Sequence, residues 1–318
     1  MFSAEYLTRL AERTGFRTDG LQKQMTLLSI LRDVNRHPTL KEAYALKGGT
    51  AINLIWFPLP RLSVDIDLNY VGAWDRNEML RERPLREKDL QGLIEAMGIT
   101  VQHIPGDHAG GKWRLRAPNS FGGTFTLEVD LNYLMRVPVW GVTTREPYPL
   151  DEDYVFDCRT VSFEELFAGK IKALVERAAA RDLYDVWKLW ERAVEYDQSK
   201  LKRNLLLFGL TIDSDWREKD LATIDQIDQK MLDDQLAPLL REAETLDLSS
   251  MKRGVKTLLV TLLKYSEQEQ IFMKRFYDEG RYEPELIFTD KAQIENLKKH
   301  PALLWKLQNH RKYLGLEQ

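Results

Sequence analysis

Residues 47–70, KGGTAINLIWFPLPRLSVDIDLNY, decide the fold prediction, because they join a glycine turn, a short helix and an alternating strand. Gly48 and Gly49 let the backbone approach an anion closely. The helix that begins near Thr50 presents unpaired N–H groups and the positive end of its dipole to a phosphate. Two prolines end this helix, so the chain reverses before the strand. The stretch therefore predicts a phosphate-binding turn that is followed by a strand.

The strand SVDIDL carries a pair of carboxylates. Successive side chains of a strand point to opposite faces, so Asp65 and Asp67 share one face while their apolar neighbours face a core. Adjacent carboxylates repel each other unless a cation lies between them, and Mg²⁺ or Mn²⁺ binds a few carboxylates together with substrate phosphate oxygens. Ser63 on the same face and Arg61 nearby are further candidates for triphosphate contacts. An isolated Asp-x-Asp is usually a polar strand face, but beside a Gly-Gly turn it predicts a site for a nucleoside triphosphate and its metal ion.

The same residues resemble the signature of a known family. GGT followed by RLSVDIDL is similar to the first motif of the AbiEii/AbiGii-type, MenT-like toxin nucleotidyltransferases, which belong to the DNA polymerase β-like superfamily. Thr50 stands where many relatives carry serine and keeps the hydroxyl group. The stretch FAGKIKALVERAAARDLYDVWKL at 167–189 resembles the lysine motif of the family and its Arg-Asp-x-x-Asp. The resemblance covers roughly residues 25–195 and implies a polymerase-β-like fold.

The strand TFTLEVDLNYL at 124–134 supplies a third carboxylate. Glu128 and Asp130 lie on its polar face, opposite an apolar one. Polymerase-β-like enzymes commonly have a third acidic residue on a neighbouring strand, where a base can accept the proton of the attacking hydroxyl. We favour Asp130 for this role and keep Glu128 as the alternative. A solvated strand face remains the competing interpretation for both residues.

Lys170 lies within the apolar arc of a helix that begins at Ser162. A lysine that points inward is uncommon unless its charge meets a partner, and a bound triphosphate would be such a partner. Arg177 lies on the same arc and is a second candidate for the phosphates. The alternative is that Lys170 extends its amine along the edge of the core to water.

Asp182 and Asp185 are three residues apart and are therefore neighbours on a helix. The resemblance implies that this Arg-Asp-x-x-Asp contributes to the active site. Asp185 matches the essential acid of the family better, and Asp182 is the second choice, as a nucleotide contact. The competing interpretation makes Asp182 the N-cap of the helix and Arg181 a partner in surface ion pairs.

The hydrophobic pattern predicts an α/β (α+β) fold, with a mixed sheet flanked by helices and then a mostly helical region. We expect two domains, a nucleotidyltransferase domain at 1–160 and a helical domain at 161–318 that carries the lysine and aspartate motif. The elements expected in the first domain are helices at 20–36 and 86–98 and strands at 99–104, 112–118 and 124–134.

Composition is ordinary for a soluble globular protein, with a net charge of −3 and a single cysteine. No apolar run is long enough to span a bilayer, and the N-terminus does not have the pattern of a signal peptide. We expect a cytoplasmic protein that contains no disulfide and does not associate with a membrane. Residues 251–318 hold 13 Lys or Arg against 9 Asp or Glu. This surplus suits either the solvated face of helices, which we favour, or contact with a phosphate backbone.

The resemblance also implies the reaction. The expected activity is the metal-dependent transfer of a nucleoside monophosphate from an NTP to the 3′ end of tRNA, which would block translation. The expected partner is a separately encoded antitoxin that resembles AbiEi. Two alternatives remain: transfer to a protein or a small molecule, and a module that binds nucleotide or RNA without catalysis.

Overall fold

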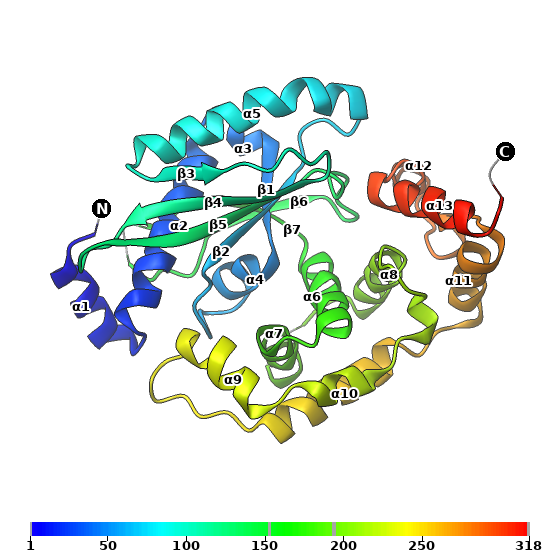
Figure 1. The fold of residues 1–318 in the computed structure, drawn as a ribbon. Coiled ribbons are helices and arrows are strands. Elements are labelled where there is room, and N and C mark those ends of the chain that lie inside the picture. The colour runs from blue at the N-terminus through cyan, green and yellow to red at the C-terminus, as the bar shows by residue number, and fades with distance from the viewer. Residues whose placement is uncertain (1, 152–153, 193–194, 317–318) are drawn as a thin grey trace. The chain divides into compact units, whose positions relative to one another are not determined.

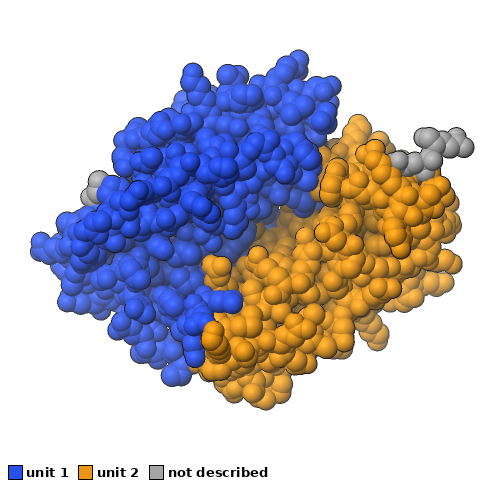
Figure 2. Space-filling view, viewed as in Figure 1, with its two compact units in different colours: residues 1–162, 233–245 blue, residues 163–232, 246–318 orange. Residues whose placement is uncertain are grey.

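The computed structural model describes residues 2–151, 154–192 and 195–316. The chain divides into two compact units, shown in different colours in Figure 2: unit 1 comprises residues 1–162 and 233–245, and unit 2 comprises residues 163–232 and 246–318. Residues 233–245 lie within the range expected for the helical domain, 161–318, and they pack within unit 1. There the Leu62 N–H donates to the Leu239 carbonyl at 2.8 Å, and Arg241 donates to the Leu59 carbonyl at 3.1 Å.

Unit 1 is built on a seven-stranded mixed sheet with the strand order β3-β4-β5-β2-β1-β7-β6 (Figure 1). Strand β2 runs parallel to β5 and β1 runs parallel to β7, while the other neighbours are antiparallel. The mixed sheet and the α/β class are as predicted. The strands are β1 Tyr44–Lys47, β2 Asp65–Tyr70, β3 Thr100–His103, β4 Gly110–Pro118, β5 Thr124–Asn132, β6 Val142–Arg145 and β7 Cys158–Val161.

One face of this sheet is covered by helices, and its side chains form the core of unit 1. The helices α2 (Thr18–Arg36), α3 (Leu40–Ala43) and α5 (Arg76–Ala96) contact one another and form a layer against the strands (Figure 1). The first helix, α1 (Ala4–Thr14), packs on α2. Strand side chains such as Trp113 and Val129 are fully buried in this core. On the opposite face, the polar side chains of β2, β4 and β5 are partly or fully exposed, apart from the buried Asn69. This is the alternation expected of a sheet with one solvated face.

The helix expected at 86–98 begins ten residues earlier, at Arg76. The Asp75 carboxylate caps it by accepting hydrogen bonds from the N–H groups of Asn77 and Glu78. Pro84 lies inside the helix and leaves the Leu80 carbonyl without its N–H donor. The Leu80 side chain is exposed on this surface helix, so water can reach that carbonyl and the helix continues through the proline.

Unit 2 is almost entirely helical, as expected. Helix α10 packs closely on α7, because Gly254 faces the ring of Trp190 and a Cβ at residue 254 would lie 2.5 Å from it. None of the helices in the described residues is long and apolar enough to cross a bilayer. The helices of unit 2 are α6 Phe163–Arg177, α7 Ala180–Glu191, α8 Gln198–Gly209, α10 Leu248–Leu262, α11 Glu267–Glu279, α12 Lys291–Leu297 and α13 Pro301–Tyr313; α9, Gln229–Gln235, leads back to unit 1.

Candidate active site

The polar face of the sheet in unit 1 brings four carboxylates together. Asp65 and Asp67 lie on the same face of β2, as predicted from the strand period. Because β5 runs parallel to β2, Glu128 is the register partner of Asp65, and Asp130 is the register partner of Asp67. Residues paired across neighbouring strands share a face. Both candidates for the third carboxylate therefore lie beside the Asp-x-Asp pair.

The surroundings of Glu128 and Asp130 differ. Lys112 of β4 places its Nζ 2.8 Å from Glu128 Oε2, so this carboxylate is already paired with a cation. The Asp130 carboxylate forms no hydrogen bond or ion pair with any residue that the structure describes. Burial raises the pKa of Asp130, with Lys47 acting against this shift and Asp67 adding to it. Of the two, Asp130 is the carboxylate better suited to accept a proton.

The glycine turn adjoins the Asp-x-Asp pair. Gly48 has φ +69°, which favours glycine, and a Cβ at this position would lie 2.0 Å from Asp67 Oδ2. The Asp67 carboxylate thus lies directly against the Gly48 backbone. Lys47, the last residue of β1, is the register partner of Asp67 on β2. The structure therefore brings together the turn and the acidic pair that the sequence predicted as one site.

Two buried hydroxyl groups connect this turn to the acidic strand. Thr50 lies in the short helix α4 (Gly48–Ala51), and its hydroxyl donates to the Asp65 carbonyl and lies 2.7 Å from Ser63 Oγ. The Ser63 N–H in turn donates to Gln24 Oε1 of α2 at 2.7 Å. These contacts fix where β2 begins and hence where Asp65 stands. Gln24 is not among the residues predicted from the sequence; the signal that could have indicated it is a glutamine on an otherwise apolar helix face.

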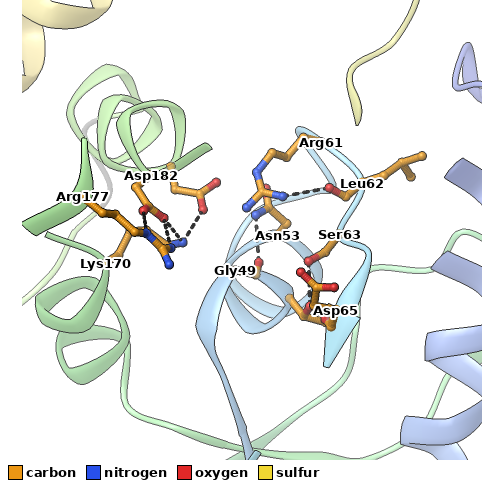
Figure 3. Close-up of polar contacts among 11 residues, drawn as sticks. Gly49, Asn53, Arg61, Leu62, Ser63, Asp65, Lys170, Arg177 and Asp182 are labelled. Atoms are coloured by element: carbon orange, nitrogen blue, oxygen red, sulfur yellow. Dashed lines mark hydrogen bonds and ion pairs between the residues drawn. The ribbon is translucent and has the colours of Figure 1, made fainter. Parts of the chain in front are cut away.

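The remaining predicted residues of unit 1 lie in the segment between turn and strand (Figure 3). The Gly49 carbonyl accepts a hydrogen bond of 2.8 Å from Asn53 Nδ2, at the start of a π-helical turn, Ile52–Trp56. Arg61 is buried at 2% exposure and donates to the Leu62 carbonyl at 2.8 Å. In this structure Arg61 contacts the loop backbone, and its role toward phosphate stays a prediction.

The Lys and Asp motif of unit 2 forms a buried ion cluster (Figure 3). Lys170 is 8% exposed, which confirms its predicted inward position. Its Nζ lies 2.7 Å from Asp182 Oδ1 and 3.1 Å from Asp185 Oδ2. Arg177 donates from Nε to Asp182 Oδ2 at 2.7 Å and from Nη2 to Oδ1 at 3.1 Å. The partners of the inward lysine thus include the two aspartates of its own motif.

The cluster also decides between the interpretations of Asp182. The N-cap of α7 is Ala179 and Asp182 lies inside the helix at 1% exposure, so the N-cap interpretation is wrong. Burial acts to raise the pKa of Asp182, but the charges and hydrogen bonds of Lys170 and Arg177 outweigh it and hold that pKa well below its usual value.

The donor set in unit 1 suits a metal ion that shares its ligands with a substrate. Among the described residues, no group of three or more His, Cys, Asp or Glu side chains is arranged as a complete metal site. The carboxylates of Asp65 and Asp67 by themselves could supply only part of a coordination sphere. Mg²⁺ is commonly held in this way, by one or two carboxylates together with water and substrate phosphates.

Comparison with known proteins shows the family to which this chain belongs. The fold is similar to that of MenT4, a nucleotidyltransferase toxin from Mycobacterium tuberculosis H37Rv, with a TM-score of 0.66 and 18% sequence identity over 95% of this chain and 99% of that one. The comparison with curated proteins finds no match. The family model described as nucleotidyl transferase AbiEii toxin, type IV toxin–antitoxin system, matches residues 29–268. This chain therefore belongs to the AbiEii family of nucleotidyltransferase toxins.

Proposed function

We propose that this nucleotidyltransferase transfers a nucleoside monophosphate to the 3′ end of tRNA and thereby blocks translation in the cytoplasm. The activity, the NTP substrate and an antitoxin partner follow from the family; the tRNA acceptor, the AbiEi-like identity of the antitoxin and the residue roles are proposed here. The observation that carries the proposal is the parallel register of β2 and β5, which aligns Asp67 with Asp130 beside the glycine turn. We further propose that units 1 and 2 are the nucleotidyltransferase domain and the helical domain.

The donor nucleotide is assigned to the turn and the acidic pair. The backbone of Gly48, Gly49 and Thr50 would contact the β- and γ-phosphates, with Ser63 and Arg61 as additional contacts. Asp65 and Asp67 would hold Mg²⁺ or Mn²⁺, since family members use a divalent metal. When bound, such an ion stabilises negative charge on the attacking and leaving oxygens of an in-line displacement.

Asp130 is assigned to the acceptor. The 3′ oxygen forms a bond to the α-phosphorus, the bond from that phosphorus to the bridging oxygen breaks, and pyrophosphate leaves. The proton of the acceptor hydroxyl passes to Asp130, whose raised pKa makes it a better proton acceptor than an ordinary aspartate. Glu128, paired with Lys112, is not needed for this step.

The motif of unit 2 is assigned to the triphosphate. Lys170 and Arg177 carry two positive charges that Asp182 and Asp185 balance, so the cluster as a whole is close to neutral. The Arg177 side chain is 63% exposed and Lys170 is buried. We assign the first phosphate contact to Arg177, and we assign to Asp182 and Asp185 the positioning of both cations, with Asp185 as the acid essential for activity.

The test uses purified protein, total tRNA, Mg²⁺ and each labelled NTP in turn, alongside Asp67→Asn, which keeps the size of the side chain. Label on tRNA with native protein and none with Asp67→Asn is the expected result. Labelling at the native rate by the variant would contradict the metal role. An unlabelled tRNA despite NTP binding would contradict the acceptor and favour transfer to a protein or a small molecule.

A further inference from the structure

Strand β4 carries a row of three cations that none of the roles above uses. Lys112, Arg114 and Arg116 are all exposed, while Trp113 and Leu115 between them are buried in the core. Side chains two residues apart on a strand point to the same face, in steps of about 6.8 Å. The three cations therefore form a straight row on the solvated face of the sheet; we call it the β4 cation row.

The β4 cation row starts beside the carboxylates of the active site. Strands β4 and β5 are antiparallel neighbours (Figure 1), and Lys112 is the register partner of Asp130. Arg114 is the partner of Glu128, and Arg116 is the partner of Thr126. The row thus shares a face with Asp130 and runs away from it along the strand.

Two of the three cations in the row, Arg114 and Arg116, have no carboxylate partner among the described residues. Only Lys112 is paired with a carboxylate, that of Glu128. Arg116 donates from Nε to Thr124 Oγ1 at 2.9 Å, a neutral partner. The guanidinium group of Arg114 has no hydrogen bond or ion pair with any residue that the structure describes. On the other side, β3 pairs Thr100 with Arg116 and His103 with Arg114 and supplies no acid. On β5 the register partner of Arg114 is Glu128, whose ion pair is with Lys112.

Strand order separates the β4 cation row from the donor nucleotide. Strand β1, which leads into the glycine turn, is the neighbour of β2 on one side, and β5 and β4 follow on the other side. The row therefore lies on the side of Asp130, the residue assigned to the acceptor hydroxyl. Its charge is placed to attract the acceptor, while the donor triphosphate is assigned to the opposite side of β2.

We propose that the β4 cation row binds the phosphate backbone of a nucleic-acid acceptor and so places its 3′ hydroxyl at Asp130. The proposal rests on the proposed function, of which it defines the acceptor surface. Evenly spaced, exposed cations, two of which have no carboxylate partner, suit a strand that repeats its negative charge. Guanidinium groups bind phosphate oxygens in a forked geometry. An acidic protein surface, such as that of the antitoxin, is the competing occupant, and the test separates the two.

The test compares the double variant Arg114→Gln/Arg116→Gln with a control of equal charge change, Arg76→Gln/Arg81→Gln on α5. All four side chains are exposed, and α5 lies in the helical layer against the opposite face of the sheet. Binding of unmodified tRNA is measured by fluorescence anisotropy over a range of salt concentrations, without NTP or metal. Thermal melting and NTP binding of both variants verify that fold and donor site are intact.

We expect the row variant to bind tRNA about tenfold more weakly than native protein at low salt, with the control unchanged. The slope of log K against log[salt] is expected to fall by about 1.4, because each phosphate contact on a single strand contributes about 0.7. In transfer assays, the KM for tRNA rises while kcat stays close to native. Equal affinity and slope in both variants would overturn the proposal, and so would loss of antitoxin binding with RNA binding retained. If native protein binds tRNA through the β4 cation row but transfers no label to it, the proposed reaction is contradicted and the proposed binding surface is supported.

Discussion

The carboxylate of Asp67 lies against the backbone of Gly48, so that a Cβ at residue 48 would come within 2.0 Å of Asp67 Oδ2. The glycine turn and the acidic strand therefore fit closely together. Any side chain at residue 48 would displace Asp67, the proposed metal ligand. Thr50 and Ser63 strengthen this connection through their buried hydroxyls.

Gly48→Ala is expected to abolish most of the transfer activity, by at least about a hundredfold in kcat/KM, since small misplacements of reacting groups have effects of this size. The positive φ adds about 1 kcal/mol of strain, so a modest loss of thermal stability accompanies the effect. Gly92→Ala is the control. Nothing lies within 4 Å of a Cβ there, and alanine is favoured in the helix α5, so that variant should be fully active and slightly more stable. A fully active Gly48→Ala enzyme would contradict the arrangement.

Asp130→Asn and Glu128→Gln separate the two candidates for the third carboxylate. We expect Asp130→Asn to lower kcat by about 10² to 10⁴, the usual effect of removing a general base. Glu128→Gln should change kcat less than about fivefold, because its main loss is the ion pair with the exposed Lys112. Single-turnover rates with saturating NTP and acceptor provide the measurement. The reverse order of effects would transfer the assignment to Glu128.

Lys170→Met is expected to destabilise unit 2 by about 3–5 kcal/mol, because it leaves the buried carboxylates of Asp182 and Asp185 without their shared cation. Lys188→Met on the neighbouring helix is the matched comparison. Lys188 pairs with Glu191, whose side chain is 39% exposed, so its loss should cost about 1 kcal/mol or less. Urea unfolding followed by circular dichroism measures both. Similar costs for the two variants would show that the Lys170 cluster is not the main stabilising contact.

Local pattern was enough to predict the parts of the site, and distant pairing was not. The shared face of Asp65 and Asp67 and the inward side of Lys170 follow from strand and helix periods, and the structure confirms them. The parallel register that sets Asp130 beside Asp67 depends on residues more than sixty positions apart, which periodicity does not address. The partners of Lys170 were equally hidden, because they lie on another helix.

The sequence did not predict the short strands β1, β6 and β7 or the role of the β4 cation row, for different physical reasons. Strands β1, β6 and β7 have four residues each, too few for a period of two to stand out. The β4 cation row lay within a strand that was predicted, but its meaning came only from the register with β5. The segment 233–245 returns to unit 1 through contacts with residues far away in the sequence, such as Leu62 with Leu239 and Leu59 with Arg241, which local composition does not reveal.

The depressed pKa of Asp182 makes the stability of unit 2 depend on pH in acid. A carboxyl group whose folded pKa lies below its unfolded value, about 3.9, stabilises the fold above that value. This contribution is lost as the pH falls toward the lower folded pKa, where Lys170 and Arg177 no longer face a carboxylate. We therefore expect the contribution of Asp182 to the free energy of unfolding to be constant from about pH 7 to 5 and to decline below about pH 4. Asp182→Asn removes the titrating group and should give a less stable protein at pH 7 whose stability falls less steeply in acid. Urea unfolding of both proteins at half-unit steps from pH 3 to 7 measures the two slopes, and parallel curves would show that Asp182 is not the group responsible.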